Sequence, residues 1–376
     1  MSKVTMIGCD LHDRNMLLQV AVGRGKPWQL EFRNDAKGRL KMISGLKKIA
    51  LEKGNGRIVL AYEASGLGHN LSDQLHDAGI QCHVLSPNQL PKTSKSAKLK
   101  TDAKDAMMLL EQVRGFVLAG NSMPAVWTPP KQLRADRELV RARVDSGDEI
   151  TRVKLKLKSF MKVNQLSLES PTERLWTKAH IREIRKVLLD QLDFSLATKL
   201  DLLLQRLEYY QQEQLALDRA IKTLSGSQRY AAACQQLRNL PGVGLLVAMT
   251  FLTEMGDLNR FNNRREVAAY LGLCPASHES GNTDNRKGRI TRQGPARLRK
   301  MLCQATWVAI QRCQEAQAAY HRIRQDQQKR TKKALVALMR KLAIRMWHEA
   351  MSMGVSPELE GRGGPSAMLD HAATPA

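Results

Sequence analysis

The chain has 376 residues, with 60 Lys and Arg against 36 Asp and Glu, so its formal net charge at pH 7 is +24. The length predicts two or three domains, because a typical domain has roughly 100–200 residues. A hydrophobic content of 43% and a charged content of 26% exclude a wholly disordered chain. The charge indicates a polyanionic partner, because Lys and Arg displace counterions from phosphates, but ribosomal, chromosomal, nuclease and membrane-surface proteins all fit that description.

The apolar and cysteine patterns predict a cytoplasmic protein without a membrane partner. No apolar run approaches the roughly 18 residues that span a bilayer, and the N-terminal residues lack the basic and then apolar layout of a signal peptide. The six cysteines show no zinc-ligand spacing, so we expect reduced thiols that act as small packing residues.

The first 124 residues alternate short apolar runs with helical stripes. Strands are predicted over 4–10, 16–22, 27–32, 57–63 and 81–87, and helices over 37–50, 66–78 and from about 101. The close spacing of the first three strands predicts an antiparallel meander. This element order is that of an RNase-H-like fold, an α/β domain with a mixed sheet.

Prolines near residue 124 end that domain, and long helices are predicted over 131–166 and 183–224. In the second helix a 4,3 spacing continues over four heptads, with Gln214 as the one polar member: Leu196, Leu200, Leu203, Leu207, Tyr210, Gln214, Leu217, Ile221 and Leu224. Such a seam is typical of a coiled coil, so we expect self-association through it. The alternative is an amphipathic helix packed on its own domain.

The region 228–355 is predicted to be mostly helical and strongly basic. Between Arg286 and Arg345 there are 17 Lys and Arg against two acidic residues, a local net charge of +15. The residues 356–376 contain little apolar content and are expected to form a disordered tail.

Four carboxylates are candidates for a metal site. Asp10 and Glu63 each end an apolar strand, and Asp102 and Asp105 lie three residues apart on one helix face. In the RNase-H-like order the first and fourth strands are neighbours, and the last helix presents its carboxylates toward them. Converging carboxylates repel unless a cation intervenes, and oxygen ligands select Mg²⁺ or Mn²⁺. Two such ions about 4 Å apart can clamp a reacting phosphodiester. Any one of these residues alone would more simply be a cap, as Asp102 is at a predicted helix start.

A Pro-Gly-Val-Gly turn at 241–244 lies between two helical stretches. It is similar to the hairpin of helix-hairpin-helix modules, in which the backbone N–H groups of Gly242 and Gly244 would approach a phosphate. The alternative is a plain interhelical turn that needs glycine.

A loop at 278–282 holds a candidate nucleophile, Ser280, between an acidic residue and glycine. The alternative is an ordinary polar loop residue, and His278 is either a general base or a solvated residue. Basic side chains after this loop are the predicted phosphate contacts: Arg286, Lys287, Arg289, Arg292, Arg297, Arg299 and Lys300.

These motifs together resemble the DEDD-type insertion-sequence transposases related to the Piv invertase. The similar segments are Gly-Cys-Asp10, Tyr-Glu63-Ala-Ser-Gly, the stretch 100–106, and the segments 240–244, 269–275, 279–281 and 288–299, in the same order. The resemblance runs from about residue 4 to residue 355.

The resemblance implies a RuvC-like domain over 1–124, a coiled-coil dimerisation segment over 125–227 and a helical transposase domain over 228–355. Asp10, Glu63, Asp102 and Asp105 fall on the metal-binding carboxylates, and Ser280 falls on the nucleophile. The implied activity cuts and rejoins DNA through a 5′-phosphoserine, guided by a structured noncoding RNA. The implied protein is prokaryotic and nucleoid-associated, and it forms a dimer, and a tetramer in the synaptic complex.

Two other functions compete with this one. A Holliday-junction-type endonuclease would use the same carboxylates to activate water and would form no covalent intermediate. A non-catalytic nucleic-acid-binding protein would account for the charge and the seam, but it has no use for four strand-end carboxylates.

Overall fold

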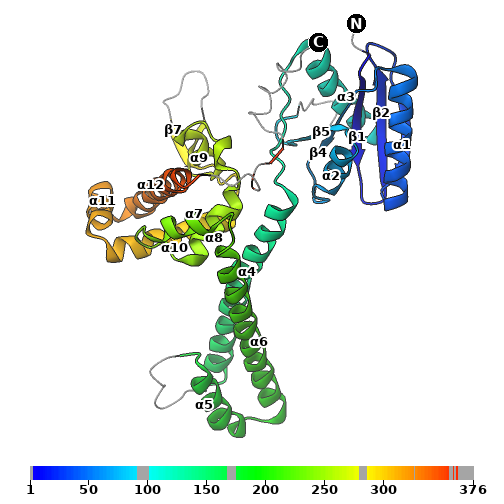
Figure 1. Cartoon of the computed structure of the whole chain (residues 1–376). Helices are drawn as coiled ribbons and strands as arrows, with labels where there is room; N and C mark the ends of the chain where they lie inside the picture. Colours follow the sequence, from blue (N-terminus) through cyan, green and yellow to red (C-terminus); the bar gives the residue numbers. More distant parts are fainter. Residues whose placement is uncertain are drawn as a thin grey trace. The chain divides into compact units, whose positions relative to one another are not determined.

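The computed structural model describes residues 3–90, 101–166, 175–278, 286–325, 327–354, 359 and 361–362 (Figure 1). The chain divides into an N-terminal unit, residues 1–129 with 361–376, and a C-terminal unit, residues 130–360. The long helices expected as a separate segment over 125–227 therefore share one unit with the C-terminal helices. In the described parts of the chain, no helix combines the length and apolarity needed to cross a membrane.

The N-terminal unit is a five-stranded mixed sheet with three helices. Its elements are β1 (Thr5–Leu11), β2 (Asn15–Val22), β3 (Trp28–Arg33), α1 (Ala36–Lys53), β4 (Ile58–Glu63), α2 (Asn70–Asp77), β5 (Gln81–Leu85) and α3 (Asp102–Ala119). The strand order is β3-β2-β1-β4-β5. The first three strands are antiparallel, whereas β4 is parallel to β1 and to β5. The predicted meander and the predicted pairing of the first and fourth strands are confirmed.

Each face of this sheet has its own core. On one face, Ile7 and Cys9 pack with residues of α1 and α2. On the other face, Met6 packs with Leu109 and Val113 of α3. Because side chains alternate along a strand, Gly8 and Asp10 belong to the α3 face.

The approach of α3 to β1 depends on Gly8. A Cβ atom at this position would lie 2.1 Å from the carbonyl oxygen of Ala106 and 2.2 Å from the amide nitrogen of Leu110. Only a glycine lets the helix backbone come this close to the strand. Asp102, the first residue of α3, is thereby held near the end of β1.

The described residues of the C-terminal unit are helical apart from one short hairpin and the connecting loops. Its elements are α4 (Lys131–Val163), α5 (Lys178–Leu188), η1 (Leu189–Gln191), α6 (Phe194–Ser225), α7 (Ala231–Arg238), α8 (Leu245–Met255), η2 (Leu258–Arg260), α9 (Arg264–Tyr270), β6 (Pro275–His278), β7 (Arg286–Ile290), α10 (Ala296–Arg312), α11 (Gln314–Arg324), η3 (Gln328–Arg330) and α12 (Thr331–Ser352). The predicted helix over 183–224 is in fact two helices. The break occurs because the Asp193 side chain accepts a hydrogen bond from the Leu196 amide and so starts a new helix.

The helices α4 and α6 lie side by side as a long arm, with α5 near its tip (Figure 1). Part of the predicted seam is buried inside this arm, against α4 and α5: Leu200, Leu203 and Leu207 pack with Ile150, Val153, Leu157, Ile181 and Ile184. The polar member Gln214 lies beside Arg143, which also pairs with Asp218. This packing agrees with the alternative of a helix on its own domain, because α4 supplies a matching apolar stripe. Self-association of the arm stays a prediction.

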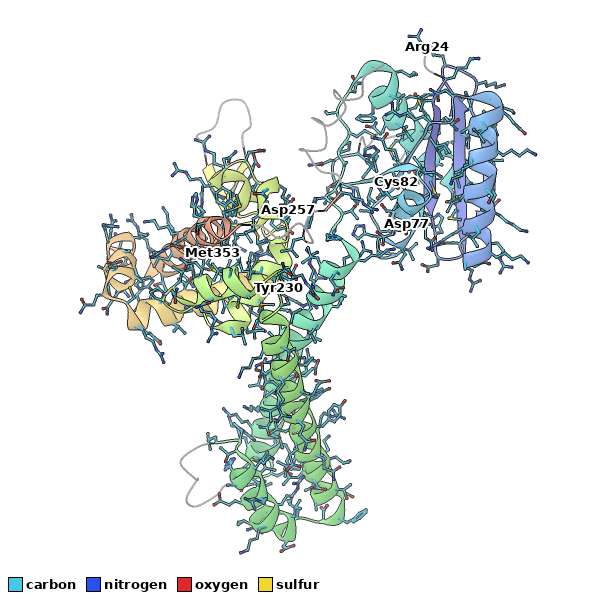
Figure 2. The ribbon with its side chains drawn as sticks, in the orientation of Figure 1. Arg24, Asp77, Cys82, Tyr230, Asp257 and Met353 are labelled. Atoms are coloured by element: carbon cyan, nitrogen blue, oxygen red, sulfur yellow. The ribbon has the colours of Figure 1, made fainter. Side chains whose placement is uncertain are left out.

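Buried charges fasten α4 to the helices beside it. Glu254 of α8 is 3% exposed and accepts from Arg141 Nε at 2.7 Å and Nη2 at 3.0 Å. Nearer the start of α4, Asp136 accepts a hydrogen bond at 2.9 Å from the hydroxyl of Tyr230, which is labelled in Figure 2. Arg229 pairs with the same carboxylate. These pairs offset the cost of burying the carboxylates and fix the base of the arm.

The structure bears on two further expectations, the reduced state of the cysteines and the disorder of the C-terminal tail. The six cysteines are free, and burial raises the pKa of the Cys9 thiol. The expectation of a disordered tail over 356–376 is wrong at Arg362, which pairs in an antiparallel bridge with Thr128, and at Gly361, which packs on Trp127. Most of the other tail residues lie outside the described part.

Candidate metal centre and nucleic-acid interface

Two of the four predicted carboxylates come together with a histidine. His12 Nε2 lies 3.1 Å from Asp10 Oδ2 and 3.5 Å from Asp102 Oδ1. The three ligand atoms all lie within 4.8 Å of one another. The Asp10 side chain is 17% exposed, whereas the side chains of His12 and Asp102 are 53% and 61% exposed. We call these three residues the carboxylate–imidazole cluster.

The electrostatics of the cluster favour a cation. Burial is the largest cause that raises the pKa of Asp10, and the nearby His12 imidazole acts in the opposite direction. The carboxylates of Asp102 and Asp105 raise this pKa further. Three carboxylates are therefore close enough to repel one another, and a bound cation would relieve that repulsion.

Glu63 and Asp105 lie next to the cluster but outside it. Tyr62 pairs with Cys9, so Glu63 and Asp10 are the next residues of two neighbouring parallel strands. Asp105 follows Asp102 by three residues on α3. Thr101 is the N-cap of α3, and Asp102 lies in the first helical turn, where a carboxylate also favours the start of a helix.

His12 is the residue that the sequence analysis missed. Its backbone is held on both sides: its amide donates to the Asn15 carbonyl at 2.9 Å, and its carbonyl accepts from Asn34 Nδ2 at 2.7 Å. Asn34 is in turn held by Arg39, whose Nε donates to the Asn34 Oδ1 at 2.7 Å. The available signal was the Asp-x-His spacing, because residues two apart share one face of a strand.

The donor set fits a divalent cation. Two carboxylates and an imidazole are ligands that first-row divalent ions accept, and carboxylates also suit Mg²⁺. The residues present are therefore compatible with Mg²⁺ or Mn²⁺, the ions expected from the sequence.

Three of the predicted phosphate contacts lie on α10 and have protein partners instead of free side chains. Arg297 donates to both carboxylate oxygens of Asp145, at 2.8 and 2.7 Å, and Lys300 pairs with Asp148. Arg299 Nη1 donates to three backbone carbonyls, those of Leu271, Gln293 and Gly294, at 3.2, 2.6 and 3.1 Å. Arg299 therefore holds the chain at the base of the β6–β7 hairpin, and its phosphate contact stays a prediction.

The remaining basic positions lie in β7 of the hairpin, apart from Arg292, which follows it. The side chains of Arg289 and Arg292 are exposed, in agreement with a surface role. The backbones of Arg286 and Lys287 lie in β7 and that of His278 in β6, but their side chains are outside the described part. Ser280 also lies outside the described residues.

The Pro-Gly-Val-Gly turn connects α7 to α8, and its two glycines differ. Gly242 has a φ of +81°, and a Cβ there would lie 2.1 Å from the Ala305 carbonyl oxygen of α10. The turn therefore needs glycine at this position for packing on α10, and the phosphate contact of Gly242 stays a prediction. Gly244 is the N-cap of α8, with no atom within 4 Å of the Cβ position, so the predicted phosphate contact stays open there.

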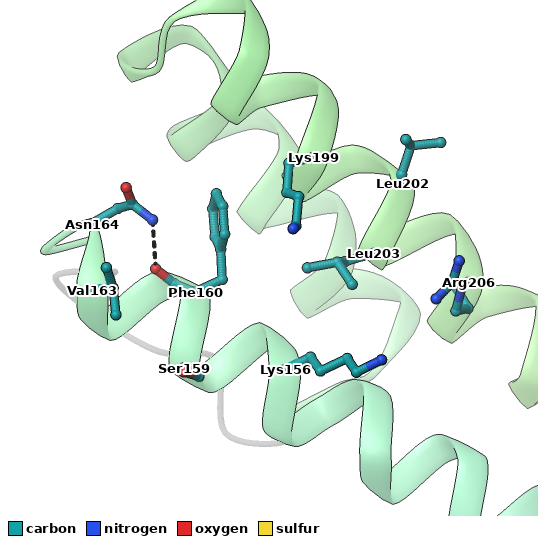
Figure 3. A pocket seen from close by; sticks show the side chains of 9 residues that line it. All are labelled: Lys156, Ser159, Phe160, Val163, Asn164, Lys199, Leu202, Leu203 and Arg206. Carbon is teal, nitrogen blue, oxygen red and sulfur yellow. Dashed lines mark hydrogen bonds between the residues drawn. The ribbon is translucent and has the colours of Figure 1, made fainter.

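A second basic surface lies on the arm. A groove of about 620 Å³ lies between α4 and α6, and Figure 3 shows the side chains that line it. Lys156, Lys199 and Arg206 line it together with apolar side chains such as Phe160 and Leu202. Positive charge is therefore not confined to the stretch after the hairpin.

Comparison with known proteins identifies the family. A family model described as "Transposase IS116/IS110/IS902 family" matches residues 234–322. A second model, described as "Transposase" and named for the DEDD domain of IS110, matches residues 7–164, which include the carboxylate–imidazole cluster. The two matches together cover about two thirds of the chain.

Relatives agree with these matches. A putative transposase of Sinorhizobium fredii is 29% identical over 254 residues, 66% of this chain and 58% of that protein. The transposase for an insertion sequence element of Leptospira borgpetersenii is 25% identical over 315 residues, 82% of this chain and 86% of that protein. The pilin gene-inverting protein of Moraxella bovis is 32% identical over 108 residues, 28% of this chain and 33% of that protein. The chain therefore belongs to the IS116/IS110/IS902 family of transposases.

Proposed function

We propose that this chain cuts and rejoins DNA as the transposase of an insertion sequence, through a 5′-phosphoserine formed at Ser280. The observation that carries the proposal is the carboxylate–imidazole cluster at the junction of β1 and α3, inside the segment that matches a transposase model. A solely nucleic-acid-binding protein would gain nothing from this cluster, because acidic groups near DNA weaken binding unless a cation is present.

Each step of the proposed reaction forms one phosphate ester bond and breaks another. The Ser280 hydroxyl oxygen attacks phosphorus, the bond from phosphorus to the 3′ oxygen breaks, and the leaving oxygen takes a proton. A 3′-hydroxyl of the other DNA then attacks the phosphoserine and releases the serine, so no nucleotide cofactor is consumed. A divalent cation would supply stabilisation of the negative charge on the attacking or leaving oxygen. Asp10 and Asp102, with Glu63 and Asp105, would hold that cation.

The proposed partners are DNA, a guide RNA and further copies of the chain. The positive charge supports the first two, and the division of the chain into two units bears on the third. Arg289 and Arg292 would contact DNA phosphates, and the basic groove of the arm would contact phosphates of a structured noncoding guide RNA. Ser280 and the carboxylates belong to different units, so the proposal requires the two units to meet on DNA, in one protomer or between protomers. We propose a dimer, and a tetramer when both element ends and the target are bound.

The test is a covalent adduct between protein and DNA. Purified protein is incubated with DNA that carries the element ends and with the transcript of the noncoding DNA beside the gene, and the products are separated in SDS. The proposal predicts an adduct with the wild type and with the control Ser277→Ala, but none with Ser280→Ala. An adduct and normal strand exchange with Ser280→Ala would overturn the nucleophile. Free cut ends without any adduct would instead identify the Holliday-junction-type endonuclease.

A further inference from the structure

We propose that His12 is a nitrogen ligand of the metal centre and that it gives this centre a preference for Mn²⁺ over Mg²⁺. The inference rests on the proposed metal-assisted function, because it names the ion that the same carboxylates would hold. It adds a ligand that is not one of the four predicted carboxylates.

The distances within the cluster are those of atoms that share one ion. Neighbouring ligands of an octahedral ion with bonds of about 2.1 Å lie about 3 Å apart. His12 Nε2 lies 3.1 Å from one carboxylate oxygen and 3.5 Å from the other. The ring nitrogen and the two oxygens can therefore reach a common ion through small side-chain movements, without a change in the backbone.

The backbone of His12 is fixed so that the ring stays at the carboxylates. The Asn15 carbonyl holds its amide, and the Asn34 side chain holds its carbonyl. Asp10 and His12 are two residues apart, so they lie on the same side of the chain as it leaves β1, where α3 presents Asp102. Two elements and a side-chain bridge thus set the position of this imidazole.

The chemistry of the donor determines the preference. An imidazole nitrogen is a better ligand for first-row transition-metal ions, among which Mn²⁺ binds most weakly, than for Mg²⁺, which favours oxygen ligands and retains water. An all-carboxylate site would hold either ion, and a nitrogen donor raises the affinity for Mn²⁺ selectively. The competing explanation is that His12 serves as an imidazolium that only neutralises the carboxylates, in which case it would not ligate.

Pulsed electron paramagnetic resonance of Mn²⁺ bound to the full chain tests the proposal without any activity measurement. The proposal predicts modulation from a directly coordinated ¹⁴N nucleus in the wild type and in the control His348→Asn, whose histidine is exposed on α12. The modulation is lost in His12→Ala and in His12→Asn. Wild-type protein with bound Mn²⁺ but without ¹⁴N coupling would overturn it.

Competition titrations add a second criterion. In His12→Asn, which offers an oxygen in place of nitrogen, the Mn²⁺ dissociation constant is expected to rise about tenfold and the Mg²⁺ constant less than threefold. Equal changes for the two ions would overturn the proposal, and thermal melting of each variant shows whether it is folded. Asp102→Asn loses both ions if the metal centre itself is correct. If Asp102→Asn binds both ions normally, the proposed metal centre fails, and this outcome is distinct from failure of the His12 assignment alone.

Discussion

Replacement of Gly8 by alanine tests how α3 is held at the metal centre. The added Cβ would lie 2.1 Å from the Ala106 carbonyl oxygen, against 3.4 Å for an ordinary contact, so the helix must move by about 1.3 Å. Overpacking of this kind costs about 1–3 kcal/mol. For a unit of this size that loss lowers the melting temperature by roughly 3–10 °C. Because Asp102 begins α3, the shift also draws its carboxylate away from Asp10 and His12, and the affinity for Mn²⁺ falls.

The assay pairs thermal melting with Mn²⁺ titration, and the chain offers a matched control. Gly45 lies within α1, and no atom lies within 4 Å of its Cβ position. Gly45→Ala should therefore stabilise the N-terminal unit by about 0.5–1 kcal/mol and leave Mn²⁺ affinity unchanged. If Gly8→Ala melts like the wild type and binds Mn²⁺ equally well, the close approach of α3 to β1 does not position the cluster.

Four further substitutions separate packing from binding. Glu254→Gln leaves Arg141 without its buried partner, so a loss of about 3–5 kcal/mol is expected in a denaturant titration of the C-terminal unit. Arg299→Met should lower the melting temperature because three backbone carbonyls lose their donor, whereas Arg292→Gln should leave it unchanged and reduce the salt slope of DNA binding by about one. Asp10→Asn should raise the melting temperature of the metal-free protein, because burial and the neighbouring carboxylates raise the pKa of Asp10 and so disfavour its charged form, while Mn²⁺ binding is lost in a titration.

The strands and the β1-β2-β3 meander were predictable because the relevant information is local, whereas the pairing of β1 with β4 followed from the RNase-H-like element order. Apolar runs and close spacing marked β1 to β5, and the element order placed β1 beside β4. The break at Asp193 was not predicted, because the leucine spacing continues close to it and conceals a single capping residue.

The candidate site was only partly predictable. Asp10 and Asp102 stand out as carboxylates at the ends of elements, but His12 follows its strand as a lone histidine, and its backbone carbonyl is held by Asn34, which is distant in the sequence. The structural partners of Arg299 were not predictable, because the sequence shows its charge but not the backbone carbonyls that it binds. Backbone carbonyls reach a side-chain donor only through the tertiary structure, so the residue types in the sequence do not identify them.

The most direct test of the account measures DNA joining by purified protein before and after its divalent cation is removed. Protein treated with EDTA is given both element ends, target DNA and the transcript of the adjacent noncoding DNA, and new junctions are counted by amplification across them. The account predicts no junctions after chelation, recovery with Mn²⁺ in the wild type, and no recovery in Asp102→Asn. Junctions at undiminished yield in the chelated protein or in Asp102→Asn would contradict it.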